Sequence, residues 1–280
     1  MNDSAISLAD ARPLVASPLW PRIRAFLWQF ETLCDESRLR SQVQTFARSQ
    51  VPSSDPAVPP DGEPETDGDA AEPSNLRTFE LANALATTPR VAAGALRALG
   101  VEPAFHSFPA TDASRLLLLS REDYDRLAQF LGVVALAPAL RRVTAGADVR
   151  TLKAALPDYR ETLAYAAYFH RFEALFKRFE AAEQATDPAV ENSSLVPRPS
   201  SLPAAVLAAG HALLAAALSD LPPELLLRQR LRFPAGSPAD AALAREAGSV
   251  PEASASGAAL AAAKLALKLS IPQEYTTCFS

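Results

Sequence analysis

The side chains best suited to chemistry in this sequence are its three histidines and two cysteines, and their spacing argues against a metal centre. His106, His170 and His211 lie far apart, and none is accompanied by a second histidine or cysteine at the spacing that one helix face requires. Cys34 and Cys278 are equally distant from each other, so they predict neither a zinc site nor a disulfide framework. We therefore expect no metal, no cofactor and a reducing compartment.

Two adjacent pairs of like-charged residues admit both a chemical and a structural interpretation. Glu122 and Asp123 are neighbouring carboxylates, which an acid–base site would need, but they follow Ser120 at a predicted helix start. There the serine accepts a hydrogen bond from a first-turn N–H group, and the carboxylates complement the positive end of the helix dipole. Arg141 and Arg142 form either a phosphate-binding site or the solvated end of a helix. The structural interpretation is favoured for both pairs, so no catalytic residue is assigned.

Aromatic residues recur along two predicted helices. One set follows a helical spacing and consists of Tyr165, Tyr168, Phe169, Phe172, Phe176 and Phe179. Such a stripe either stacks bases, lines a cofactor pocket or forms the buried face of a helix, and burial in a core is favoured. Trp20 and Trp28 lie in a short amphipathic segment, where they either anchor a partner or pack in the core.

The composition predicts an all-α protein. Ala and Leu supply much of the 49% hydrophobic content, and only 10 of the 280 residues are glycine, which favours helix over strand. No run of large apolar residues is long enough to cross a bilayer, and the N-terminus lacks the basic and apolar parts of a secretory signal. A net charge of −5 argues against nucleic acid as a partner. We therefore expect a soluble, cytoplasmic chain that forms one all-helical globular domain over residues 1–280.

Helical periodicity, proline and glycine divide this domain into roughly nine to eleven helices. The clearest pattern covers residues 116–179, with a kink or restart expected at Pro138 and a long helix from about Asp158 to Ala185. Asp148 is expected to cap a short helix that ends near Leu156, whereas residues 101–113 are expected to be irregular. The other expected helices cover residues 20–33, 38–48, 76–86, 90–99, 204–218, 222–231, 239–247 and 257–269.

Residues 51–75 differ in kind from the rest of the chain. They contain six prolines and seven acidic residues but no basic one. Such a segment cannot bury enough apolar surface to offset the entropic cost of ordering, so we expect a disordered linker that is dispensable for folding. A second proline- and serine-rich connection, residues 186–203, is expected to be a loop.

Three stretches of the chain carry a resemblance to one protein family. The first is FETLCDESRL, residues 30–39. The second and strongest contains RLA at 126–128, LG at 131–132, LRR at 140–142, Gly146 with Val149, and Leu152 to Leu156. The third is a C-terminal helix that leads into a tail and carries Lys264, Lys268, Pro272, Tyr275, Cys278 and Phe279. On these motifs the chain resembles the SctK family of accessory proteins of the type III secretion sorting platform. The family often has tryptophan at the position of Tyr275, and residues 51–75 have no counterpart in its pattern.

The resemblance implies an all-helical protein without catalytic activity. Members of the family are cytosolic adaptors that connect the cytoplasmic domain of the inner-membrane ring protein with the pod protein of the export ATPase complex. It therefore implies two protein partners, a place at the cytosolic face of the inner membrane and a role in virulence. The alternative from another class is a helical chaperone-like or regulatory module with one protein partner.

Partner contacts are expected on exposed aromatic and basic residues, and the candidates are Trp20, Trp28, Arg141, Arg142, Tyr275 and Phe279. The last two stand in the C-terminal tail. A loose tail would be polar, because exposed aromatic rings gain nothing in water. We therefore expect Tyr275 and Phe279 to be held either on the body of this chain, which is favoured, or on a partner.

Overall fold

The computed structural model describes residues 19–28, 33–39, 41–42, 89–101, 108–109, 111–184, 202–247 and 253–273. Within these ranges every regular element is a helix, which confirms the all-α class that the sequence predicted. Some of the sequence predictions lie outside the described residues, namely the linker at 51–75, the helix at 76–86, most of the loop at 186–203, His106, Tyr275, Cys278 and Phe279.

The described part of the chain contains twelve α-helices and one 3₁₀ helix: α2 (Trp20–Trp28), α5 (Pro89–Ala98), α6 (Asp112–Leu116), α7 (Arg121–Ala135), α8 (Ala137–Arg141), α9 (Gly146–Ala155), α10 (Tyr159–Tyr165), η2 (Ala166–Phe172), α11 (Glu173–Gln184), α12 (Leu202–Leu218), α13 (Pro223–Leu231), α14 (Pro238–Ala247) and α15 (Ala253–Ser270). Residues 36–39 and 41–42 are also helical. This exceeds the expected number because periodicity merges short helices such as α8 and α10 with their neighbours. None of the helices described here is long and apolar enough to cross a membrane.

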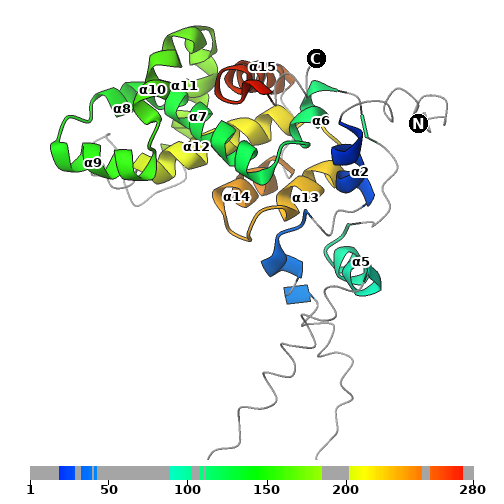
Figure 1. Cartoon of the computed structure of the whole chain (residues 1–280). Helices are drawn as coiled ribbons and strands as arrows, with labels where there is room; N and C mark the ends of the chain where they lie inside the picture. The colour runs from blue at the N-terminus through cyan, green and yellow to red at the C-terminus, as the bar shows by residue number, and fades with distance from the viewer. Residues whose placement is uncertain are drawn as a thin grey trace, which may run out of the picture.

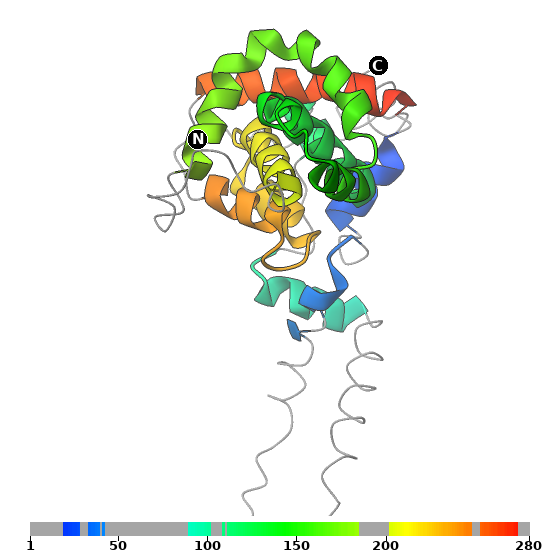
Figure 2. The same ribbon diagram turned by 90° about the vertical axis from the view of Figure 1, so that its left-hand side faces the viewer.

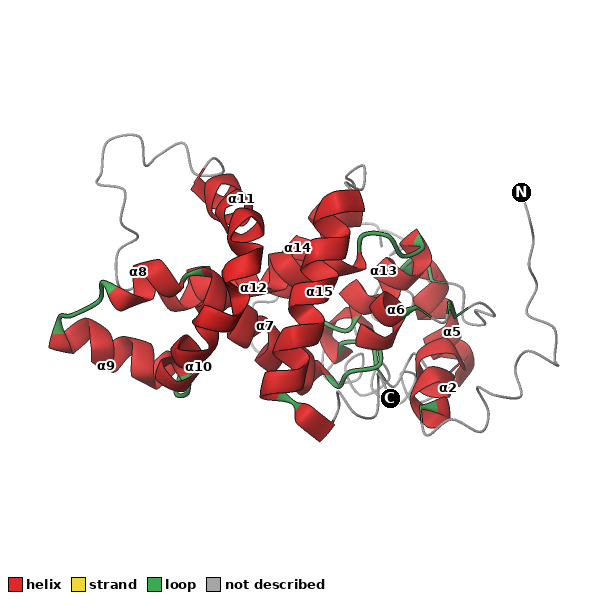
Figure 3. Cartoon of the chain, turned by 90° about the horizontal axis from the view of Figure 1, so that it is seen from above, coloured by secondary structure: helices red, strands yellow, loops and turns green. Residues whose placement is uncertain are grey.

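Helix α12 is the centre of the fold (Figures 1 and 2). It packs against α7 along its length, with α15 on one side of this pair and α14 on the other. The sequence of α12, LPAAVLAAGHALLAAAL, is apolar all round, and eleven of its residues are buried. A helix without a polar face has to be covered on every side, which explains why α7, α14 and α15 pack around α12. Seen from above, α8 and α9 extend at one end of the molecule, while α2 and α5 lie at the other (Figure 3).

Helices α7 and α12 cross at two glycines. A Cβ atom placed on Gly132 of α7 would lie 1.8 Å from the carbonyl oxygen of Val206 in α12. A Cβ atom on Gly210 of α12 would likewise lie 1.8 Å from the carbonyl oxygen of Ala128 in α7. The two backbones can approach this closely only because neither glycine carries a side chain. Glycine lowers helix propensity, and here the fold shows that Gly132 is a packing position.

A second, smaller apolar cluster lies where α8, α9 and α10 meet the N-terminal half of α12. Its buried members are Val133, Leu136, Leu140, Leu152, Leu156, Tyr159, Leu202, Val206 and Ala209. Pro138 stands in the first turn of α8, which confirms the predicted restart of the helix at this proline. The turn before α8 redirects the chain, so that α8 and α9 cover a part of α12 that α7 leaves open.

The long helix predicted from Asp158 to Ala185 is interrupted, and this part of the prediction is wrong. Helix α10 is followed by the 3₁₀ helix η2, and α11 begins only after it. The 3₁₀ winding brings residues three apart into line, so Phe169 and Phe172 both face the core and are buried. Tyr165 and Tyr168 consequently lie outward, with 36% and 63% of their surface exposed. The aromatic stripe is therefore core on its phenylalanine side, as predicted, and surface on its tyrosine side.

Phe172→Ala is expected to lower the free energy of unfolding by about 3 kcal/mol, because it removes a buried ring that packs on Phe169 and Phe176. The loss should not be larger, since η2 lies at the edge of the fold, where neighbours can relax into the cavity. Urea denaturation measures it. Tyr168→Ala is the matched control and should change stability by about 0.5 kcal/mol or less. A Phe172→Ala protein that keeps full stability and loses only partner binding would place the stripe in an interface instead.

Helices α6 and α7 begin at side-chain caps, one of which was predicted from the sequence. Ser120 Oγ accepts a hydrogen bond from the N–H of Asp123 at 3.0 Å, which confirms the predicted cap of α7. Helix α6 begins after a capping box at Thr111, so the prediction that residues 101–113 are all irregular is wrong at its end. The predicted cap at Asp148 is also wrong. Helix α9 begins two residues earlier, at Gly146, and Asp148 lies in its first turn, where the negative charge complements the helix dipole.

Two arginines, Arg228 in α13 and Arg232 directly after its end, lie in the interior, and both bind backbone carbonyl groups. Arg228 is 1% exposed, and its Nη1 donates to the carbonyl of Phe26 in α2 at 2.9 Å. Arg232 donates to the carbonyls of Leu117 and Leu119, each at 2.6 Å. These carbonyls belong to the turn between α6 and α7, where a helix end leaves backbone acceptors unpaired. The two arginines therefore fasten α2 and the α6–α7 turn to the body of the fold.

Residues 33–39 are held against the C-terminal end of α13. The N–H of Asp35 donates to the carbonyl of Leu231 at 2.8 Å, and Arg38 forms an ion pair of 2.6 Å with a carboxylate of α14. The helix predicted to start near Arg38 begins at Glu36 instead. The reason is local, since the carboxylate of Asp35 accepts the N–H of Ser37 at 3.1 Å and caps the helix.

Candidate functional site

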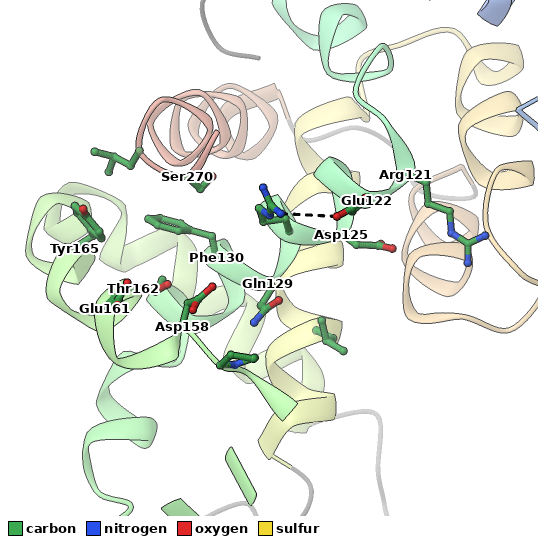
Figure 4. A pocket seen from close by; sticks show the side chains of 14 residues that line it. Arg121, Glu122, Asp125, Gln129, Phe130, Asp158, Glu161, Thr162, Tyr165 and Ser270 are labelled. Atoms are coloured by element: carbon green, nitrogen blue, oxygen red, sulfur yellow. Dashed lines mark ion pairs between the residues drawn. The ribbon is translucent and has the colours of Figure 1, made fainter. Parts of the chain in front are cut away.

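An open groove runs between α7 and α10 and is bordered by the C-terminal end of α15 (Figure 4). Its volume is about 850 Å³. Helix α10 and the residues before it contribute Pro157, Asp158, Glu161, Thr162 and Tyr165. Helix α7 contributes Arg121, Glu122, Asp125, Arg126, Gln129 and Phe130, and the remaining lining residues are Leu207, Leu269 and Ser270. Figure 4 shows Asp158 and Glu161 on the α10 side of this space and Glu122 and Asp125 on the α7 side.

The charges on the groove walls are predominantly negative. Four carboxylates and two guanidinium groups line it, and both guanidinium groups already have a carboxylate partner. Arg126 pairs with Glu122 at 3.8 Å, and Arg121 pairs with Asp35 at 3.0 Å. Within the described part of the chain, Asp158 forms no ion pair. The same holds for Glu161, so the α10 wall keeps its negative charge.

Aromatic rings form one end of the groove. Phe130 lies at its floor and is buried, and its ring centroid is 5.9 Å from that of Tyr165. Tyr165 in turn lies 6.2 Å from Tyr168. Among the described residues, these two tyrosines are the large hydrophobic side chains that are exposed. A row of rings that leads from the core to the surface offers a partner both apolar area and phenol hydroxyl groups.

A buried polar cluster lies behind the α7 wall. The imidazole of His211 stacks on Tyr124, with centroids 5.9 Å apart, and Asp125 Oδ1 is 3.4 Å from its Nε2. Burial lowers the pKa of His211 from 6.5 to about 4, so the ring is neutral at physiological pH. Burial also raises the pKa of Tyr124, whose phenol stays protonated. A neutral imidazole held between the rings of Tyr124 and Phe233 is a packing contact between α7 and α12.

The stability of the protein should fall between about pH 6.5 and pH 4 because of His211. The imidazole has a lower pKa in the folded state than in the unfolded state, so below pH 6.5 the unfolded chain binds the proton more readily. The stabilisation by neutral His211 is therefore present at higher pH and is lost as the pH falls through this window, by roughly 2–3 kcal/mol. Urea unfolding at several pH values measures it. His211→Gln cannot titrate and should show a shallower slope; an unchanged slope would assign the effect to other groups.

Of the residues that the sequence offered as partner contacts, Arg141 and Arg142 do not line the groove. Arg141 and Arg142 are exposed at the end of α8, and Nη2 of Arg141 reaches the carbonyl of Leu163 at 3.4 Å. This contact agrees with the interpretation of the pair as a helix end. The backbone of Trp20 and Trp28 lies in α2, at the opposite end of the molecule. The description of the structure does not extend to the side chains of these two tryptophans.

The remaining candidates for chemistry are separated from one another. Cys34 is buried, its Sγ donates to the carbonyl of Leu231 at 3.4 Å, and burial raises the pKa of the thiol to about 12. It is therefore a protonated packing residue and not an activated nucleophile. His170 is exposed on η2, with Nδ1 3.0 Å from the carbonyl of Ala167. Across the described ranges, no group of three or more His, Cys, Asp or Glu side chains is placed to hold a metal ion.

The groove was not predicted from the sequence. Asp158 and Glu161 stand at the start of a helix, where carboxylates are expected for reasons of dipole complementation alone. Tyr168 belongs to the aromatic stripe that was assigned to the core, and only the 3₁₀ winding of η2 turns it outward. No signal in the linear sequence brings α7, α10 and α15 together, because α8 and α9 lie between α7 and α10, and η2 and α11 to α14 lie between α10 and α15.

Comparison of the chain with models of protein families, with curated proteins and with solved structures finds no match.

Proposed function

We propose that this protein is a non-enzymatic adaptor of a type III secretion sorting platform. In this role it would link the cytoplasmic domain of the inner-membrane ring protein to the pod protein of the export ATPase complex. The proposal combines the resemblance to the SctK family with the binding surface that the groove provides. It places the protein in the cytoplasm, at the cytosolic face of the inner membrane.

The observation that carries a binding role is a pair of exposed tyrosines, of which Tyr165 lines the groove and Tyr168 lies beside Tyr165. Large aromatic side chains are normally buried, and where they are exposed next to a concave surface they are typical of protein interfaces. Tyr165 and Tyr168 meet this description, whereas the phenylalanines of the same stripe are buried. His211 and Cys34 are buried in packing contacts. Binding is therefore the role that the exposed surface supports best.

The family motifs fall on residues that build the fold, which supports a shared architecture. Leu127 and Leu131 are fully buried, and Gly132 lies at the crossing of α7 with α12. Leu140 and Leu152 belong to the second apolar cluster. Motifs made of packing positions are expected from proteins that share a helical scaffold and not a catalytic site.

Co-purification from native lysate, followed by mass spectrometry, tests the proposal. An adaptor between two components should bring down the ring protein and the pod protein together. Recovery of one small exported protein alone would favour the alternative, a chaperone-like module with a single partner. Recovery of the ring and pod proteins by Tyr168→Ala at the wild-type level would leave the adaptor role intact and place its contacts elsewhere.

A further inference from the structure

We propose that the groove between α7, α10 and α15 binds a basic segment of a partner protein, with arginine side chains placed on Tyr165 and Tyr168 and paired with Asp158 and Glu161. This inference rests on the proposed function in one respect, namely that the ligand is a protein. It adds the site on this chain and the chemistry of the partner.

The groove has a surplus of negative charge. Arg121 and Arg126 are engaged with carboxylates, so they offset little of the charge of α10. The positive end of the α10 dipole offsets part of it, but α10 has only seven residues. The C-terminal end of α15 borders the groove with Leu269 and Ser270, but Lys268 in the same turn offsets the negative end of its dipole. A cationic ligand therefore gains mainly from Asp158 and Glu161 on the α10 wall.

The exposed tyrosine rings favour an arginine side chain as the ligand. A guanidinium group can lie flat on a tyrosine ring while its N–H groups bind a carboxylate, and a lysine ammonium cannot do both equally well. The same kind of contact already occurs within this chain, since the guanidinium of Arg171 lies 4.7 Å from the ring centroid of Phe172. Tyr165 lines the groove together with Asp158 and Glu161, so an arginine there can reach a ring and a carboxylate at once.

Other classes of partner fit the groove less well. Nucleic acid and anionic lipid headgroups carry negative charge, and the carboxylates of the groove would repel them. A second copy of this chain is the competing occupant, because the exposed end of α8 and the adjacent helix α9 carry Arg141, Arg142, Arg150 and Lys153. We favour a different protein as the occupant. If α8 and α9 of one copy entered the groove of the next copy, the contact would be head-to-tail, and such contacts form a closed ring only for particular rotations between the copies. The experiment decides between the two.

The test uses the full chain and a short fluorescent peptide with arginine and leucine at helical spacing. Fluorescence anisotropy should give a dissociation constant of roughly micromolar order, and the affinity should fall as the salt concentration is raised. The double variant Asp158→Asn, Glu161→Gln should reduce affinity by about tenfold or more, and Tyr168→Ala several-fold. The matched control is the double variant Asp148→Asn, Glu173→Gln, which removes the same charge from α9 and α11. It should bind like the wild type, and all variants should keep their melting temperature.

Three outcomes would overturn the inference. The first is equal loss of affinity in both double variants, which would mean that the peptide responds to net charge only. The second is equally tight binding of the same peptide with glutamate in place of arginine. The third is concentration-dependent self-association, in analytical ultracentrifugation, that the groove variant abolishes, because the occupant would then be a second copy.

The failure of this inference can be distinguished from failure of the proposed function. If the ring and pod proteins co-purify with the groove variant as well as with the wild type, the adaptor role stands and the groove is not its contact. If the arginine peptide binds as expected and neither protein co-purifies, the groove is a binding site and the adaptor role is wrong.

Discussion

Gly210→Ala is expected to destabilise this protein by about 4 kcal/mol or more, enough to unfold a domain of ordinary stability. The added methyl group would lie 1.8 Å from the carbonyl oxygen of Ala128, and a backbone atom cannot move aside as a flexible side chain can. Relief requires α7 and α12 to separate, which would open the core around the central helix. Gly132→Ala should have a similar effect, since its Cβ would meet the carbonyl of Val206 at the same distance.

The control for this prediction is Gly257→Ala in α15. No atom lies within 4 Å of the Cβ position at Gly257, and the residue is exposed. The change should therefore stabilise the helix by about 0.5–1 kcal/mol through helix propensity alone. Circular dichroism and urea denaturation of the three variants measure the effect. Stability of Gly210→Ala close to that of Gly257→Ala would show that α7 and α12 do not cross at these glycines.

Arg232→Ala is expected to lower the free energy of unfolding by about 3–5 kcal/mol, the range for removing one member of a buried polar contact. The guanidinium donates to the carbonyls of Leu117 and Leu119 and to Oε1 of Gln229. Without it, acceptors in the α6–α7 turn are buried and unpaired, and a cavity remains beside Tyr124. Burial lowers the pKa of Arg232 to about 10, so the side chain is still charged at neutral pH and its loss is felt under ordinary conditions.

Two further variants make the measurement specific. Arg150→Ala removes an exposed arginine from α9 and should change stability by about 0.5 kcal/mol or less. Arg232→Lys keeps the charge, but one ammonium group cannot span two carbonyls as a planar guanidinium does, so most of the loss should remain. Full stability of Arg232→Lys would mean that the charge matters and the two hydrogen bonds do not.

The sequence alone was sufficient for features that depend on neighbours along the chain. The all-α class follows from composition, and the helix boundaries follow from residues such as Ser120, Pro138 and Gly100, each of which acts on the turn that contains it. Gly100 adopts a φ of 81°, the left-handed conformation that ends a helix, and the chain stops α5 there as expected. Phe169, Phe172 and Phe176 were recognisable as core from their spacing, because burial on one helix face is a periodic property.

Other features were decided only by the packing of distant segments. The sequence around Gly132 and Gly210 does not show why glycine is needed there. Each is required because the backbone of another helix passes within contact distance. The buried Arg228 and Arg232 would be assigned to the surface by any rule based on residue type, and they are tolerated inside because carbonyls from α2 and the α6–α7 turn pair with them. The groove has the same origin. Its carboxylates and Tyr165 are ordinary helix residues in the sequence, and they form a candidate binding site only because α10 and α15 both pack against α7.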